Sequence, residues 1–140
     1  MKKTSGVVKT MRLPFLLLTP ACVALGTGTA IWSVGQIDIF HLLLCLVGAV
    51  AAHICVNSFN EYFDFKSGLD FKTPKTPFSG GSGALPENPG IAKYTLFVAL
   101  LCFAITAGIG IYFLLIRGAW LLPLGVLGLL LMLIYTPVMA

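Results

Sequence analysis

Polar side chains recur on one face of an otherwise apolar segment, which reads His53-Ile-Cys-Val-Asn57-Ser-Phe-Asn60-Glu61-Tyr-Phe-Asp64. At about 100° per residue, the numbered residues fall within an arc of roughly 100° on an α-helix. A lone polar residue in such a helix can be a hydrogen bond between helices, and two acids at its end can simply face water. A whole stripe that reaches about three turns deeper favours a functional cavity.

The oxygen-rich end of this stripe predicts a site for a divalent cation. Gly68 is expected to end the helix and to turn Asp70 back toward Glu61 and Asp64. Carboxylates that lie close together repel one another unless a cation sits between them. Oxygen ligands with open water positions suit Mg²⁺ better than zinc, and Mg²⁺ in such sites normally acts through the phosphates of a substrate.

Basic residues and a glycine-rich stretch follow the acidic residues. Lys66, Lys72 and Lys75 are placed to neutralise phosphate charge, although each is also the kind of residue that faces water beside a membrane. Residues 79–83, Ser-Gly-Gly-Ser-Gly, offer backbone N–H groups that could cradle an anion. The Walker pattern is absent there, so a plain loop is the default interpretation.

The composition decides which class of protein must position these residues. Hydrophobic residues make up 58% of the 140 residues and charged residues only 10%, against about 25% in soluble domains. This excludes a soluble globule and a disordered chain. The net charge of +4 comes from too few basic residues to coat a phosphate backbone, so we expect no nucleic-acid partner. The expected partner is the lipid bilayer.

Four long uncharged stretches predict an all-α, polytopic membrane helix bundle with four transmembrane helices, because about 20 apolar residues span the hydrocarbon core. We expect one transmembrane domain over residues 1–140, with a loop at 64–91. The expected spans are about 13–34, 39–63, 92–116 and 118–138. A signal peptide is the alternative for the first, but its apolar region is too long and no convincing cleavage site follows.

The basic residues predict the orientation of the bundle. Lys2, Lys3, Lys9 and Arg12 precede the first span, whereas only Arg117 lies between the third and fourth. The 64–91 loop and its border are also rich in lysine. Under the positive-inside rule, the N-terminus and this loop are both cytoplasmic, in a multi-pass protein of the cell membrane.

The run from Asn57 to Asp70 resembles the first aspartate-rich motif of the UbiA family of intramembrane prenyltransferases. The family pattern is matched by Asn60, Glu61, Asp64 and Asp70. The upstream Asn57 and the five-residue, glycine-containing gap before Asp70 are most similar to the 1,4-dihydroxy-2-naphthoate polyprenyltransferase branch.

The resemblance implies a nine-helix bundle that transfers a polyprenyl group from its diphosphate to an aromatic acceptor, with Mg²⁺ as cofactor, in menaquinone-like quinone biosynthesis. It implies that Asn60, Asp64 and Asp70 hold Mg²⁺ and that Lys66 acts with them in catalysis. The substrate-binding residues that it implies are Asn57, Glu61, Lys72, Lys75 and Arg12.

The chain departs from the family pattern in one respect, and two other functions stay open. Family members carry a second aspartate motif, whereas the only acidic residue after Asp70 is Glu87, so we expect the chain to be an incomplete domain that corresponds to the N-terminal half of such an enzyme. The stripe could instead line an ion path in a small transport module, or dock a partner in a structural membrane subunit. Transport would predict charge across the whole bilayer depth, which the other spans do not carry.

Overall fold

The computed structural model describes residues 3–74 and 81–139, and within these ranges every regular element is a helix. The long helices are joined by short helical turns, and the elements follow one another without a domain break. In chain order they are α1 (Lys3–Thr10), η1 (Leu13–Leu17), α2 (Leu18–Val34), α3 (Ile39–Ser67), α4 (Leu69–Lys72), α5 (Ala84–Glu87), η2 (Pro89–Ile91), α6 (Ala92–Arg117), η3 (Ala119–Leu121) and α7 (Leu122–Met139).

Three helices are long and apolar enough to cross a membrane: Leu13–Val34 with 22 residues, and Ile39–Ser67 and Pro89–Arg117 with 29 each. At 1.5 Å per residue even the shortest is about 33 Å long, which matches a hydrocarbon core of about 30 Å. The fourth predicted span corresponds to a shorter apolar helix, Ala119–Tyr135, when only residues with described side chains are counted. The all-α multi-pass architecture is therefore supported, whereas a fourth span and a nine-helix bundle remain predictions.

Short-range chemistry sets the ends of these helices. Gly35 ends α2 and Gly68 ends α3, both in the left-handed region at φ 77° and 79°, which costs glycine little. Asp38 caps α3 by accepting a hydrogen bond from the His41 N–H at 3.1 Å, and this bond lowers the pKa of the exposed Asp38 carboxyl. The expected turn at Gly68 is confirmed, and it places Asp70 on α4.

The segment expected to be a loop at 64–91 is largely helical where it is described. The helix α3 continues to Ser67, α4 follows at once, and α5 and η2 precede α6. Helical continuation lets the backbone of this segment satisfy its own hydrogen bonds. It also places Asp64 on the end of α3, Asp70 on α4 and Glu87 on α5.

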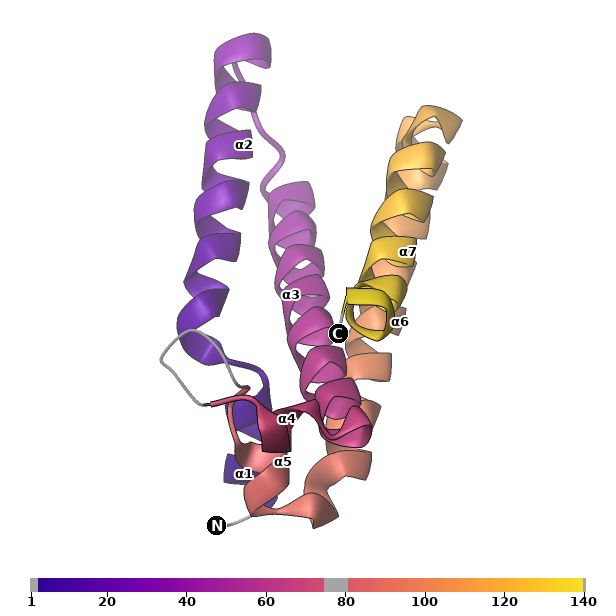
Figure 1. The fold of residues 1–140 in the computed structure, drawn as a ribbon. Coiled ribbons are helices and arrows are strands. Elements are labelled where there is room, and N and C mark those ends of the chain that lie inside the picture. Colours follow the sequence, from indigo (N-terminus) through magenta and orange to yellow (C-terminus); the bar gives the residue numbers. More distant parts are fainter. Residues whose placement is uncertain (1–2, 75–80, 140) are drawn as a thin grey trace.

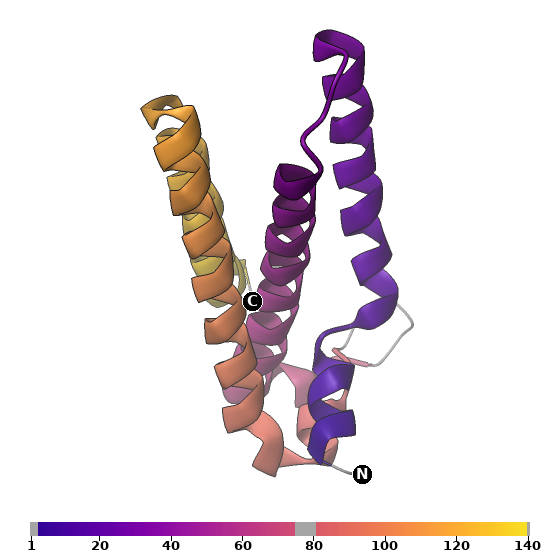
Figure 2. The same cartoon turned by 180° about the vertical axis from the view of Figure 1, so that it is seen from behind.

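The helix α3 lies at the centre of the bundle and contacts α2, α6 and α7. Figures 1 and 2 show α6 and α7 side by side on one flank of α3, with α2 on the other flank. Cys55 and Phe59 of α3 pack on Ala99 of α6 and Met132 of α7. Small side chains let these helices approach closely, as is usual when lipid offers no hydrophobic drive for packing.

The short helices α1, α4 and α5 gather at one end of the bundle, beside the start of the chain (Figure 1). A small core of Ala84, Leu85 and Ile91 joins α5 and η2 to α1 and α3, through Val7 and Phe65 packed against it. The connections between α2 and α3 and between α6 and α7 lie at the opposite end (Figures 1 and 2). The acidic end of α3 is thus enclosed by helices from both sides of the sequence.

Candidate functional site

The deeper part of the polar stripe on α3 faces the N-terminal segment of the chain. His53 Nδ1 lies 2.7 Å from the hydroxyl of Thr19 on α2. Asn57 Nδ2 donates to the backbone carbonyl of Met11 at 2.9 Å, just after α1. Polar groups at this depth need partners, and here they find them within the protein. These two residues therefore join α3 to the first span and to the segment just before it, which is a structural use of the stripe.

Arg12 occupies a strained corner between α1 and η1. Its φ of 53° and ψ of 54° lie in the left-handed region, which costs a residue with a side chain roughly 1–3 kcal/mol. The guanidinium is bound on α3, where Nε and Nη2 each lie 2.8 Å from Glu61 Oε1 and Nη2 donates to Asn60 Oδ1 at 3.1 Å. The cationic residue expected before the first span is thus held directly over the acidic motif.

Glu61 is fully buried, and both of its oxygens are engaged. Besides Arg12, it accepts hydrogen bonds from the Ser82 N–H at 2.6 Å and from the Ser82 hydroxyl at 2.7 Å. A plain loop was the default interpretation of the glycine-rich stretch, with anion binding as the alternative. In its described part, 81–83, Ser82 does bind an anion, the carboxylate of Glu61. Ser82 was not singled out from the sequence, since no local pattern joins it to α3.

A polar cavity of about 190 Å³ lies beside this cluster. Asn60 Nδ2 donates to Asp64 Oδ2 at 2.9 Å, whereas Asp64 Oδ1 is buried and has no hydrogen-bond partner among the described residues. Asp70 is buried as well, and its carboxylate abuts the backbone of Gly81 so closely that a Cβ there would lie 2.7 Å from Oδ1. The residues that line the cavity are Arg12, Asn60, Asp64, Leu69, Asp70, Thr73 and Gly81.

The donor set of this cavity fits a magnesium ion that shares its coordination with a phosphate. The described part of the chain holds no group of three or more His, Cys, Asp or Glu side chains that could bind a metal by themselves. With Glu61 bound to Arg12 and Ser82, two carboxylates and the Asn60 amide face the cavity. Mg²⁺ is usually bound through one or two carboxylates plus substrate phosphates, and the Asp64 oxygen that no described residue binds suits such a cation.

The lysines of the motif lie elsewhere. Lys66 is exposed, with its Nζ 5.8 Å from the centre of the Tyr62 ring, and Lys72 is exposed on α4. Neither is among the described residues that line the cavity, where Arg12 supplies the positive charge. Lys75 lies outside the described residues. Roles for these lysines in catalysis or substrate binding therefore remain predictions.

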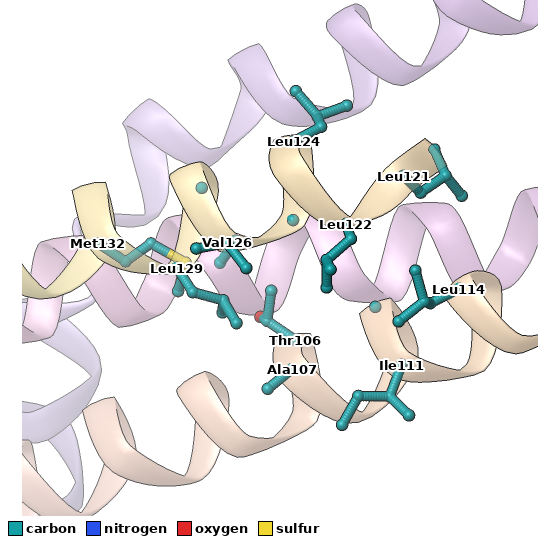
Figure 3. A pocket seen from close by; sticks show the side chains of 14 residues that line it. Thr106, Ala107, Ile111, Leu114, Leu121, Leu122, Leu124, Val126, Leu129 and Met132 are labelled. Carbon is teal, nitrogen blue, oxygen red and sulfur yellow. The ribbon is translucent and has the colours of Figure 1, made fainter. Parts of the chain in front are cut away.

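A second, apolar pocket of about 300 Å³ opens between α3, α6 and α7 (Figure 3). On α3 the pocket is lined by Ala52, which lies about 18 Å along the helix axis from Asp64 at 1.5 Å per residue. Among the lining residues, Thr106 alone carries a hydroxyl. The glycines of α6 and α7 leave room for the pocket. The lining residues are Ala52, Thr106, Ala107, Gly110, Ile111, Leu114, Leu121, Leu122, Leu124, Gly125, Val126, Gly128, Leu129 and Met132.

The sequence is similar to parts of known proteins. It is 33% identical over 115 residues to the 1,4-dihydroxy-2-naphthoate octaprenyltransferase of Bacillus subtilis (strain 168), a match that covers 81% of this chain and 35% of the relative. Two shorter matches, each 42% identical, are to the UbiA prenyltransferase domain-containing protein 1 of Xenopus tropicalis, over 50 residues, and of Danio rerio, over 55 residues. They cover 36% and 39% of this chain, and 14% and 16% of those relatives.

The chain thus spans about a third of the length of the bacterial relative and less of the vertebrate ones. No family model matches the sequence. No solved structure matches it either.

Proposed function

Since this chain is a distant homologue of the UbiA prenyltransferases, we propose that it forms the diphosphate-binding part of a prenyltransferase site. The reaction is the transfer of a polyprenyl group from its diphosphate to an aromatic acceptor. The bacterial relative has 1,4-dihydroxy-2-naphthoate and octaprenyl in its name, so a naphthoate acceptor and a menaquinone-like product are the specific proposal. The observation that carries it is that Asp64, one buried oxygen of which has no hydrogen-bond partner among the described residues, lines the same cavity as Arg12.

The residues of the cavity have complementary tasks in this reaction. Arg12 would bind the diphosphate, because a guanidinium is a fixed fork of donors that matches phosphate oxygens. Asp64 and Asp70, with Asn60, would hold Mg²⁺, and Asn60 keeps Asp64 in place through its bond to Oδ2. When bound, the ion neutralises the negative charge that develops on the diphosphate as the C–O bond breaks.

The apolar helices would keep water away from the reacting carbon. An allylic carbon that loses its diphosphate is attacked by water unless the site is dry. The pocket between α3, α6 and α7 lies at the lower end of the usual volume range for ligand sites, which supports room there for part of an apolar chain. A prenyl chain bound there and the lipid chains of the bilayer would share one apolar environment.

The test is prenyl transfer by the membrane-embedded gene product with Mg²⁺, with Asp64→Asn as the variant. The substitution keeps the size of the side chain but removes its charge, so we expect turnover to fall roughly 10²-fold or more. Asp38→Asn is the matched control, since Asp38 is exposed at the far end of α3. Naphthoate and phenolic acceptors assayed side by side identify the acceptor. Unchanged turnover in Asp64→Asn contradicts the proposal.

A structural role is the second candidate, and one observation favours it for part of the stripe. The bonds of His53 to Thr19 and of Asn57 to Met11 join α3 to α2 and to the segment after α1. If the acidic end has the same purpose, Asp64→Asn will lower the thermal stability of the protein without any effect on prenyl transfer or on binding of magnesium pyrophosphate.

A further inference from the structure

We infer that Glu61 and Ser82 are positioning residues, which fix the Arg12 guanidinium and the Gly81 backbone at the polar cavity without contacting the substrate themselves. This inference rests on the proposed function of that cavity. It gives Glu61 a different task from the acids beside it in the sequence, since Asp64 and Asp70 line the cavity and Glu61 does not.

The burial of Glu61 is the first reason. Its side chain is 0% exposed, and a buried carboxylate is tolerated only when it is paired and hydrogen-bonded. Arg12 supplies the opposite charge, and Ser82 supplies one N–H and one O–H donor. With both oxygens so engaged, Glu61 is a fixed anchor on the rigid helix α3.

The way in which Arg12 is bound is the second reason. Its bonds to Glu61 and Asn60 use Nε and Nη2, and a guanidinium has five N–H donors. As far as the described residues show, the Nη1 edge is left for a ligand. Arg12 also lies in a strained left-handed conformation, so without Glu61 its backbone would relax and the side chain would lose its direction.

The contact between Gly81 and Asp70 is the third reason. Ser82 is tied to Glu61 by two bonds, and its neighbour Gly81 lies directly against the Asp70 carboxylate. A bond at Ser82 therefore limits where Asp70 can move. Through these contacts the buried carboxylate of Glu61 sets the positions of both the Arg12 guanidinium and the Asp70 carboxylate.

The test measures binding and turnover separately in the membrane-embedded gene product. Glu61→Gln keeps the shape of the side chain and removes the charge that holds Arg12. We expect the Kd for magnesium pyrophosphate and the KM for the prenyl diphosphate to rise about tenfold or more, with the KM for the acceptor unchanged. Because Glu61 acts in large part through Arg12, the loss of affinity in the Glu61→Gln, Arg12→Gln double variant should be smaller than the two single losses combined.

Glu87→Gln is the matched control. Glu87 pairs with Lys9 at 3.3 Å and so joins the same two segments, but both side chains are nearly half exposed. It should bind pyrophosphate like the wild type. Ser82→Ala keeps the Arg12 pair and removes one bond, so it should show a smaller loss of affinity, and it serves as the second variant if Glu61→Gln does not fold.

The outcomes separate this inference from the proposed function. If the wild type and Glu87→Gln bind pyrophosphate and Glu61→Gln binds it equally well with only a lower melting temperature, Glu61 is merely structural and the inference is wrong. If the wild type itself neither binds pyrophosphate nor transfers a prenyl group, the proposed function fails first. A loss of affinity in Glu61→Gln that is not additive with Arg12→Gln supports the inference.

Discussion

At the scale of single residues, neighbouring polar side chains on α3 have different tasks. Asn57 donates to a backbone carbonyl, Glu61 accepts from a guanidinium, and Asp64 lines a cavity. The residue types alone do not distinguish these uses, since an amide and a carboxylate can each bind protein, metal or substrate. What distinguishes them is which donors the N-terminal segment brings to each position.

Asn57→Ala should destabilise the N-terminal segment. The substitution removes the donor to the Met11 carbonyl and leaves that acceptor without its bond, at a cost of about 1 kcal/mol. We expect a lower melting temperature in detergent and faster cleavage by trypsin after Arg12, with the affinity for pyrophosphate nearly unchanged. Ser5→Ala, an exposed change on α1, is the control. Equal cleavage rates in the two variants would show that the bond does not hold this segment.

At the scale of elements, the sequence predicted the helices and turns that are set by residues close together in the chain. The long apolar runs and the glycine at 68 are local signals, and the expected helices and the turn toward Asp70 are both present. The partners of Glu61 are not local: Arg12 lies 49 positions away and Ser82 lies 21. A left-handed arginine gives no sequence signal, because such positions are normally occupied by glycine or asparagine.

Helix packing between α3 and α6 makes another prediction. A Cβ at Gly48 would lie 3.3 Å from Cγ2 of Ile109, so Gly48→Leu should force the helices apart and destabilise the protein by about 1–3 kcal/mol. Gly108→Leu on α6 is the matched control, because a Cβ there meets nothing within 4 Å. Thermal unfolding of both in detergent checks this. Equal melting temperatures would mean that α3 and α6 do not pack closely at Gly48.

At the scale of the whole molecule, the bundle has two unlike ends. One end collects α1, α4 and α5 with most of the basic residues and the polar cavity, and the other holds the short connections between long helices (Figures 1 and 2). Charge distribution in the sequence predicted that the N-terminus and the 64–91 segment share a side of the membrane, and the structure places α1, α4 and α5 at one end. Composition could not predict which helices touch, because each of the spans is apolar along its length.

The difference between the two ends predicts which end of the bundle an external reagent can reach in intact cells. Single cysteines at Ser5, Lys72 and Gln36 would be tested in a protein whose four native cysteines are replaced by alanine. An impermeant thiol reagent should label the cysteine at Gln36 from outside, and should reach those at Ser5 and Lys72 only after the cells are opened, because basic segments stay on the cytoplasmic side. Labelling of Ser5 and Lys72 from opposite sides would contradict the bundle itself. Labelling of both from outside would leave the bundle intact but reverse its orientation, and would place the polar cavity on the outer side of the membrane.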